Sequence, residues 1–438
     1  MNSIPSRREF LATSTAALAA GAAINVQAGE PGKLAIHGGE KAVGPAPKFA
    51  RWGEPERDQL NKVVDQTSLL YWKGPQTTLF TERYKAIYPQ QHVHVCSSGT
   101  AALHIAVAAS GIGPGDEVIT SSITDIGTVI GVIYQQGIPV FADLKPSTFN
   151  LDPDDVARRI TPRTKAIIAV HLGGNPADMG ALRKLADQHN LILIEDCCQA
   201  WGAQDRGQPI GSAGHIACFS LQQSKHITTG DGGVVASSHP TIGPLLQRFG
   251  DKGADRGGAT GGLFHQFATN YRMSELQAAF AAAQITRLEK VAANRAQAGN
   301  LLTSRITGVK GITPHHVNDA DRCVYWFYML RMGPAAFRCD RAEFVKALAA
   351  EGIPAAAGYI PVPLYGNPVF QQHSFFGGRW PVKELGLTDM DYSKVSLPET
   401  EAILKTCIRI QINEAMPDDY VEAIAAGVKK VARHYAVA

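Results

Sequence analysis

Short apolar runs alternate with helical patterns along most of the chain, and this alternation constrains the fold more than any other feature. Seven apolar runs, each bounded by Gly, Pro, Asp or Ser, have the length of strands. Helical patterns lie between several of them, so they predict an α/β fold: a mostly parallel seven-stranded sheet with helices on both faces. The runs span residues 92–97, 117–121, 138–143, 166–172, 191–197, 215–221 and 232–237, and the helical patterns include 100–110, 153–160 and 181–190.

The last two runs depart from the parallel rule. Residues 215–221 and 232–237 are joined too closely for a helical crossover, so we expect them to pair antiparallel, with Lys225 in their connection. After them a long helical pattern runs from Ser274 to about residue 302 and could lead out of the sheet domain.

The C-terminal part has a different pattern, which predicts a smaller α+β domain with strand, helix, strand and helix at 323–332, 341–351, 407–412 and 418–435. A chain of 438 residues also exceeds the length at which one hydrophobic core usually stops growing. We therefore predict a signal segment at 1–28, an N-terminal arm with helices at 29–90, a large domain at 91–305 and a small domain at 306–438.

The first 28 residues have the features of a targeting segment. Arg7 and Arg8 form a twin-arginine pattern, and an alanine-rich, weakly apolar run with small residues at 26 and 28 follows. The run is too short and too polar to span a bilayer stably. We expect export to the periplasm by the twin-arginine route; the alternative is a disordered basic N-terminus on a cytoplasmic protein.

Net charge and cysteine content narrow the range of binding partners and of fold types that the chain can have. The formal net charge of +3 is too small to favour nucleic acid or a membrane surface as partner, so a small-molecule substrate is expected. The seven cysteines are odd in number and several lie in apolar strands, which predicts buried thiols instead of a disulfide framework.

Lys225 and Asp196 carry the predicted chemistry. Lys225 follows an apolar strand and precedes a glycine-dense turn, while Asp196 ends an apolar strand and Gln199 follows three residues later. On residue type alone, Lys225 could be a solvated surface lysine and Asp196 a helix cap or an arginine partner. Their order, with a phosphate-binding signal upstream, predicts pyridoxal 5′-phosphate (PLP): a lysine for its aldehyde and a carboxylate for its protonated pyridine nitrogen.

The phosphate signal lies at Ser98, Gly99 and Thr100, where a strand ends in a small-residue turn that opens a helix. Free backbone N–H groups and the positive end of a helix dipole meet at such a place. Ser220 offers a second hydroxyl five residues before Lys225. The alternative is that these residues are ordinary N-caps. No histidine spacing indicates a metal site.

Several motifs resemble the DegT/DnrJ/EryC1/StrS family, the sugar and cyclitol aminotransferases among the PLP enzymes of fold type I. The resemblance runs from about Lys33 to the C-terminus. The motifs are SGTAAL at 98–103, GIGPGDEV at 111–118, FNLDP at 149–153, TPRTKA at 161–166, VHLGGNPADM at 170–179, EDCCQA at 195–200, SLQQSK at 220–225 and NYRMSELQAA at 270–279.

The resemblance implies a role for each matching residue. Lys225 would form the Schiff base and shuttle the proton, Asp196 would face the pyridine nitrogen, and Gln199 would donate to the ring oxygen. Asn270 would reach the phosphate of the neighbouring subunit's cofactor, which implies a homodimer with shared active sites. The implied reaction moves an amino group from glutamate or glutamine to a keto-sugar or keto-cyclitol. Arg272 and residues 359–365 are candidates for substrate contact.

Asp125 departs from the family pattern. The family places an aromatic residue over the cofactor ring in the segment that here spans 121–128, and Asp125 falls at that position. A carboxylate cannot supply a stacking surface. The alignment slips here, another residue covers the ring, or the cofactor's electronics differ.

Two other functions stay open. One is a different PLP chemistry on sugars, such as dehydration, although that branch replaces the lysine with histidine and this chain keeps Lys225. The other is a non-catalytic PLP- or sugar-binding protein on the same fold.

Overall fold

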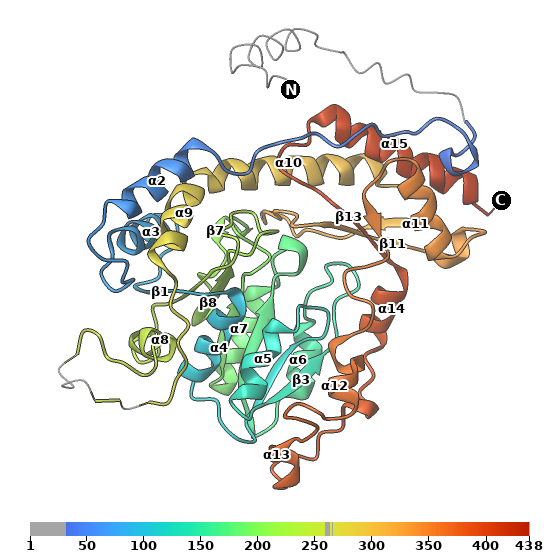
Figure 1. Ribbon diagram of the computed structural model, residues 1–438. Helices are drawn as coiled ribbons and strands as arrows, with labels where there is room; N and C mark the ends of the chain where they lie inside the picture. The colour runs from blue at the N-terminus through green and yellow to red at the C-terminus, as the bar shows by residue number, and fades with distance from the viewer. Residues whose placement is uncertain (1–31, 259–262, 265, 438) are drawn as a thin grey trace, which may run out of the picture.

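The computed structural model describes residues 32–258, 263–264 and 266–437, and the predicted signal segment lies outside them. A seven-stranded sheet forms the centre of the larger part (Figure 1). Its order is β1 (His92–Cys96), β9 (Gly233–Ser237), β8 (Ile216–Ser220), β5 (Ile192–Asp196), β4 (Thr164–Val170), β2 (Glu117–Ser121) and β3 (Ile138–Ala142).

The direction of the strands confirms the predicted sheet. Strands β3, β2, β4, β5 and β8 run parallel, and β9 is antiparallel to both β8 and β1. The antiparallel pairing of β8 and β9 was predicted, and the pairing of β1 with β9 was not. Most central strands are buried along their whole length, as expected for a sheet covered on both faces.

Helices cover the two faces of the sheet with apolar side chains. On one face the strands pack against α4 (Gly99–Ala109) and α8 (Gly243–Gly250), and α5 (Gly127–Tyr134) packs on α4. On the other face they pack against α6 (Pro153–Arg159) and α7 (Met179–His189), and further along against α3 and α9. The N-terminal helices α2 (Glu54–Val64) and α3 (Pro75–Lys85) both contact α9.

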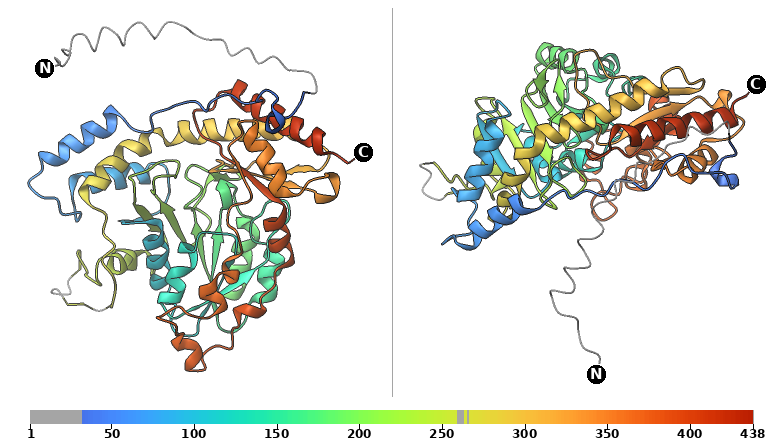
Figure 2. Two further views of the ribbon diagram at one scale, coloured as in Figure 1. Left: turned by 45° about the vertical axis from the view of Figure 1, so that its right-hand side comes forward. Right: turned by 90° about the horizontal axis from the view of Figure 1, so that it is seen from above.

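The predicted single helix from Ser274 to about 302 is wrong in one respect. The chain forms α9 (Glu275–Gln284), one 3₁₀ turn at Ile285–Arg287, and α10 (Leu288–Ile306). The two helices have different partners, since α9 packs on α2 and α3 while α10 packs along α15 (Asp418–Tyr435), as Figure 2 shows from above. The turn lets each helix follow its own partner.

A smaller four-stranded antiparallel sheet forms the C-terminal part, in the order β10 (Ile312–Pro314), β11 (Tyr328–Met332), β13 (Cys407–Ile410) and β12 (Ala355–Ala356). One face packs on α10, α11 (Arg341–Ala350) and α15, and the other faces the large sheet. Short helices α12 (Pro368–Gln371) and α13 (Pro381–Glu384), with α14 (Pro398–Thr406), precede β13, and a small hairpin joins β6 (Gln204–Asp205) to β7 (Gln208–Pro209).

The predicted strand at 323–332 begins only at Tyr328. The residues before it form hydrogen bonds to a glycine turn after β4: Val324 N–H donates to the Gly174 carbonyl (3.1 Å) and Trp326 N–H to the Gly173 carbonyl (2.8 Å). This detour brings Trp326 to the edge of the large sheet. None of the helices in the described ranges is both long and apolar enough to cross a bilayer.

Candidate active site

Lys225 lies in the turn between β8 and β9, at the carboxyl edge of the large sheet. Its side chain is buried, and its Nζ lies 3.6 Å from the centroid of the Trp326 ring. No hydrogen-bond acceptor for this Nζ is found in the described part of the chain. Burial lowers the pKa of the Lys225 amine, and Cys198, Asp196 and Asp125 oppose part of this effect. The amine is thus buried, unpaired and easier to deprotonate than a surface lysine.

Asp196 ends β5 at the same edge, and the next strand is β8, which leads to Lys225. Its carboxylate is buried and held on both oxygens. Thr128 Oγ1 donates to Oδ2 at 2.8 Å, and the Cys198 N–H donates to Oδ1 at 3.1 Å. These two donors fix the orientation of the carboxylate, but no cationic side chain of the described residues pairs with it. Asp196 and Lys225 thus lie near each other at one sheet edge, as predicted, and the charge of Asp196 acts on the Lys225 amine.

Gln199 presents its amide N–H₂ group to the same space. The Gly173 N–H donates to Gln199 Oε1 at 2.8 Å, which leaves Nε2 to face the Tyr359 hydroxyl at 3.5 Å. Gly173 has a φ of 64°, and a Cβ there would lie 2.9 Å from the Phe327 ring. A glycine is needed at this position, and it orients Gln199 as a hydrogen-bond donor.

The first turn of α4 carries residues that were predicted to hold a phosphate. Ser98 is the N-cap, and its Oγ accepts the Ala101 N–H at 3.0 Å, so its own proton stays available for donation. Gly99 lies against Ser220, because a Cβ on Gly99 would be 2.7 Å from the Ser220 Cβ. The Thr100 hydroxyl lies near Gly127, 2.6 Å from where a Cβ on that glycine would be. The structure thus brings these four predicted residues around one helix N-terminus.

Asp125 and Asn270 occupy different places. The exposed Asp125 lies beside this first turn of α4: its Oδ1 accepts the Gly127 N–H at 2.8 Å, and its charge reaches Lys225. Asn270 is exposed and accepts the Arg272 N–H at 3.3 Å, and none of its described contacts joins it to Lys225. Its role toward a neighbouring subunit stays a prediction.

Arg272, a candidate for substrate contact, already has a partner. Its NH1 forms an ion pair with the buried Asp251 at 2.6 Å, and Arg256 shares the same carboxylate. Tyr359, by contrast, lies in the site through its contact with Gln199. Sequence reasoning missed Trp326 and Thr128. The aromatic-rich stretch around residue 326 was a usable signal for the first, whereas an ordinary buried threonine gives none.

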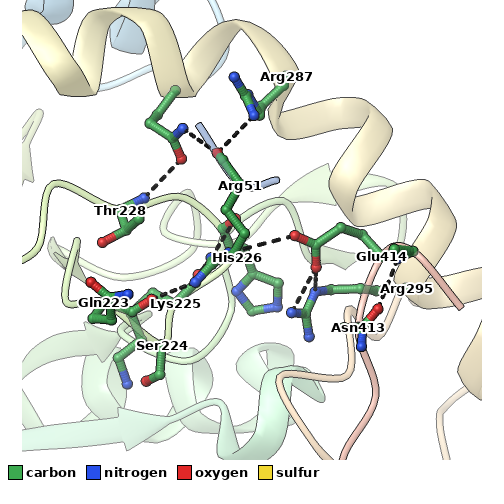
Figure 3. A network of polar contacts seen from close by, with 12 residues as sticks. Arg51, Gln223, Ser224, Lys225, His226, Thr228, Arg287, Arg295, Asn413 and Glu414 are labelled. Atoms are coloured by element: carbon green, nitrogen blue, oxygen red, sulfur yellow. Dashed lines mark hydrogen bonds and ion pairs between the residues drawn. The ribbon is translucent and has the colours of Figure 1, made fainter. Parts of the chain in front are cut away.

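An arginine far away in the sequence holds the Lys225 turn. The Arg51 guanidinium donates to the carbonyls of Gln223 and Lys225, and to that of His226 at 3.3 Å. It also lies 3.7 Å from Glu414 Oε1. Figure 3 shows Arg51 in the middle of this network, between the Lys225 turn and the C-terminal segment.

Other residues hold both the backbone carbonyl of Arg51 and the Glu414 carboxylate beside its guanidinium. Its carbonyl accepts hydrogen bonds from Gln284 Nε2 (2.8 Å) and Arg287 NH1 (2.7 Å), on the turn between α9 and α10. Glu414 is held from the other side by the buried Arg295 at 2.8 Å. Through Arg51, the N-terminal arm, the long helices and the C-terminal segment are therefore all connected to the turn that carries Lys225.

His171, Glu195 and Cys197 form a buried cluster beneath this edge, with ligand atoms within 4.8 Å of one another. His171 Nδ1 accepts the Ala177 N–H, so Nε2 carries the proton and donates to Glu195 at 3.2 Å. The N–H groups of Gly211 and Gly214 donate to the same carboxylate. The histidine and the carboxylate are thus engaged in holding a loop under β5, which argues against a metal ion there.

The family model of the DegT/DnrJ/EryC1/StrS aminotransferase family matches residues 52–429. The chain belongs to this family. It is 36% identical over 311 residues to a GDP-perosamine synthase from Caulobacter vibrioides, covering 70% of this chain and 82% of that protein. It is 32% identical over 424 residues to L-glutamine:2-deoxy-scyllo-inosose aminotransferase from Streptomyces kanamyceticus, covering 92% and 98%.

Solved structures agree with this membership in the DegT/DnrJ/EryC1/StrS family. The crystal structure of S. venezuelae DesV in complex with a ketimine intermediate has a TM-score of 0.74 and 30% identity, covering 86% of this chain and 94% of that one. The protein is a PLP-dependent aminotransferase of fold type I, with the mostly parallel sheet and the smaller C-terminal sheet described above.

The residues at the sheet edge fit PLP. At one edge of the sheet lie a buried amine and an oriented carboxylate, neither paired with a side chain of the described residues, and a helix N-terminus where a glycine is closely packed. These are the groups that an aldehyde, a protonated pyridine nitrogen and a phosphate require.

Proposed function

We propose that this aminotransferase transfers an amino group from L-glutamate or L-glutamine to a ketone on a sugar or cyclitol. The observation that carries the proposal is the buried Lys225 amine, which has no hydrogen-bond partner among the described residues and lies near the oriented Asp196 carboxylate. According to their names, one of the relatives named above synthesises GDP-perosamine and the other transfers an amino group between L-glutamine and 2-deoxy-scyllo-inosose. These names support the sugar or cyclitol class and make glutamine a donor to test first.

In the proposed reaction the chain's own residues have separate tasks. Bound PLP supplies an electron sink for the carbon that carries the donor's amine. Lys225 Nζ would hold the aldehyde, give it up to the donor, and then move the proton between that carbon and the C4′ atom of PLP. Asp196 would keep the pyridine nitrogen protonated, and Gln199 Nε2 would donate to the ring oxygen. Ser98, Gly99, Thr100 and Ser220 would hold the phosphate.

The donor half-reaction tests this function directly. Purified protein with PLP should show a visible absorption band that converts to the pyridoxamine form when L-glutamine or L-glutamate is added. Lys225→Ala should lack the band, while Lys184→Ala, at an exposed position on α7, should keep it. A wild-type band that no amino acid converts would rule out transamination.

The shared active site is also part of the proposal. An exposed Asn270 and the exposed apolar side chains of Leu263, Phe264 and Phe267 near it support a homodimer in which Asn270 reaches the neighbouring subunit's cofactor. Mixing inactive Lys225→Ala and Asn270→Ala dimers under exchange conditions should restore part of the activity, because each hybrid holds one intact site. Mixtures as inactive as their components would refute sharing.

Export to the periplasm is the proposed localisation, supported by the twin-arginine pattern at Arg7 and Arg8. Cell fractionation should find the wild-type protein in the periplasm and an Arg7→Lys, Arg8→Lys double variant in the cytoplasm. Equal distribution of the two proteins would show that the pattern is not used.

A further inference from the structure

Trp326 comes from the C-terminal part of the chain and covers the Lys225 amine. The Lys225 Nζ lies 3.6 Å from the centroid of the Trp326 ring, inside the roughly 6 Å at which a cation and an aromatic face attract each other. Among the described residues this nitrogen has no hydrogen-bond acceptor. The ring face is therefore in a position to act on the charge of the nitrogen.

Three contacts hold the Trp326 side chain in this position. Its indole Nε1–H donates to the Ser224 carbonyl at 2.8 Å, in the turn that carries Lys225. Its backbone N–H donates to the Gly173 carbonyl at 2.8 Å. Its ring packs against the Tyr359 ring, with 5.8 Å between the centroids and an angle of 75° between the planes. The ring is thus fixed relative to the amine by its backbone, its indole nitrogen and a second ring.

Burial and the ring face act on the Lys225 amine in opposite directions. Burial lowers the pKa of this amine, because a charged nitrogen loses its hydration there. An aromatic face stabilises a cation, most strongly where water is excluded, so Trp326 opposes the effect of burial. The other titratable or charged groups around the amine are Cys198 and Asp196 after β5, Asp125 before α5, His226 in the same turn, Arg51 of the N-terminal arm and Tyr359. The first three of these also raise the pKa of the amine.

We propose that Trp326 keeps the Lys225 nitrogen protonated while that nitrogen holds the PLP aldehyde, an inference that rests on the role of Lys225 in the proposed function. A protonated Schiff-base nitrogen withdraws electrons from the carbon that the donor's amine attacks. Burial alone would make this proton easier to lose. An aromatic face compensates for burial and accepts no proton itself, so the nitrogen stays free to give up its proton and take it back. Trp326 thus acts on the reaction through Lys225.

A pH titration of the visible absorption band tests the proposal. The absorption of the PLP-loaded protein changes when the Schiff-base nitrogen loses its proton, so the midpoint of the titration reports how tightly the nitrogen holds it. In Trp326→Leu the nitrogen should bind its proton about tenfold more weakly than in wild type, and the midpoint should move to lower pH. Trp326→Phe keeps a ring face without the indole N–H, so its proton binding should stay within about threefold of wild type.

Phe327→Leu is the matched control. The Phe327 ring is buried and packs against the Trp326 ring, with 5.0 Å between the centroids, but no contact among the described residues joins it to the Lys225 amine. This variant loses an aromatic ring from the same segment and reproduces any general loosening, yet it should keep the wild-type midpoint. Urea unfolding of the PLP-free proteins checks that each variant is folded over the pH range of the titration.

Three results would overturn the proposal. One is a wild-type midpoint in folded Trp326→Leu. Another is the same midpoint in Trp326→Phe as in Trp326→Leu, because the effect would then belong to the hydrogen bond to Ser224 and not to the ring face. The third is an equal shift in Phe327→Leu.

The titration also separates this inference from the proposed function. If the wild-type band titrates but no amino acid converts it, transamination is refuted, and the midpoints of the variants still decide the role of Trp326. If wild type forms no such band with PLP, the role of Lys225 and this inference are both overturned.

Discussion

Arg51 provides the sharpest test of how the fold holds Lys225, the proposed Schiff-base lysine. Replacing it with methionine removes the donations to three carbonyls of the Lys225 turn and the contact with Glu414, while the aliphatic stem is kept. Glu414 remains paired with Arg295, so no carboxylate is left without a cation. The change therefore tests the hydrogen bonds from Arg51 to the Lys225 turn without creating an unpaired carboxylate.

The expected loss follows from these contacts. A hydrogen bond from a charged donor contributes about 1.5–3 kcal/mol, but neighbouring contributions are not additive and an accessible ion pair adds only about 0.2–1 kcal/mol. The Arg51 side chain is 18% exposed, so water can replace part of what is lost. We expect Arg51→Met to lower the free energy of unfolding by about 2–3 kcal/mol.

The assay combines urea unfolding with the donor half-reaction. Arg57→Met is the matched control, since Arg57 lies on α2 with a largely exposed side chain and pairs with Glu54, which is also largely exposed. A loosened Lys225 turn should slow the limiting rate of the half-reaction about tenfold, with little change in the donor's dissociation constant. Arg51→Lys should recover only part of both losses, because an ammonium cannot reach three carbonyls as a fork does.

If Arg51 only stabilises the fold, a different result is expected. Arg51→Met would then unfold more easily but convert the donor at the wild-type rate under native conditions. Unfolding and half-reaction rates equal to those of Arg57→Met would refute the reasoning altogether.

Three further predictions concern the site and the core. Thr128→Val removes the side-chain donor to Asp196 and should slow the half-reaction about 10- to 100-fold in stopped-flow absorbance, and an unchanged rate would contradict the role given to that donor. Gly99→Ala places a Cβ 2.7 Å from a side chain across the phosphate site, so fluorescence titration should show at least about tenfold weaker PLP binding; equal affinity would contradict the close fit. Burial lowers the pKa of His315 from 6.5 to about 4, so only the unfolded chain takes up this proton between those pH values, and the free energy of unfolding should fall as pH drops from 6.5 to 4. His315→Gln should reduce that fall by about 3 kcal/mol, since each pKa unit is worth about 1.4 kcal/mol, whereas His316→Gln, at an exposed position, should not.

The large sheet could be predicted from sequence because its signals are local. Each of the seven strands begins and ends within two residues of its predicted bounds, since buried strands are continuous apolar runs. Lys225 and Asp196 could be placed together for the same reason: the carboxyl ends of neighbouring parallel strands meet at one edge. The pairing of β1 with β9 was not predictable, because the residues of an apolar run do not indicate which other strand it pairs with.

Contacts between segments that are far apart in the chain could not be predicted from the sequence. Arg51 and Lys225 are 174 residues apart, and no local pattern marks an arginine that binds carbonyls. Trp326 was missed because the segment before β11 has the composition of a strand but forms hydrogen bonds to the glycine turn after β4. Its ring lies against the Lys225 amine, so the C-terminal part supplies an aromatic surface at a site where Asp125 cannot.

The electrostatics of the site concern Asp196 and the cationic side chains around it. Asp196 is buried and accepts two hydrogen bonds, yet no lysine or arginine of the described chain pairs with it. The nearby amine of Lys225 is pushed toward its neutral form by burial, so it compensates the carboxylate poorly. The guanidinium of Arg51 is held at the backbone of the turn instead, where it fixes Lys225 without competing for Asp196. In the proposed function the carboxylate would bind a protonated ring nitrogen and the amine an aldehyde, so both groups would gain their partners when PLP binds.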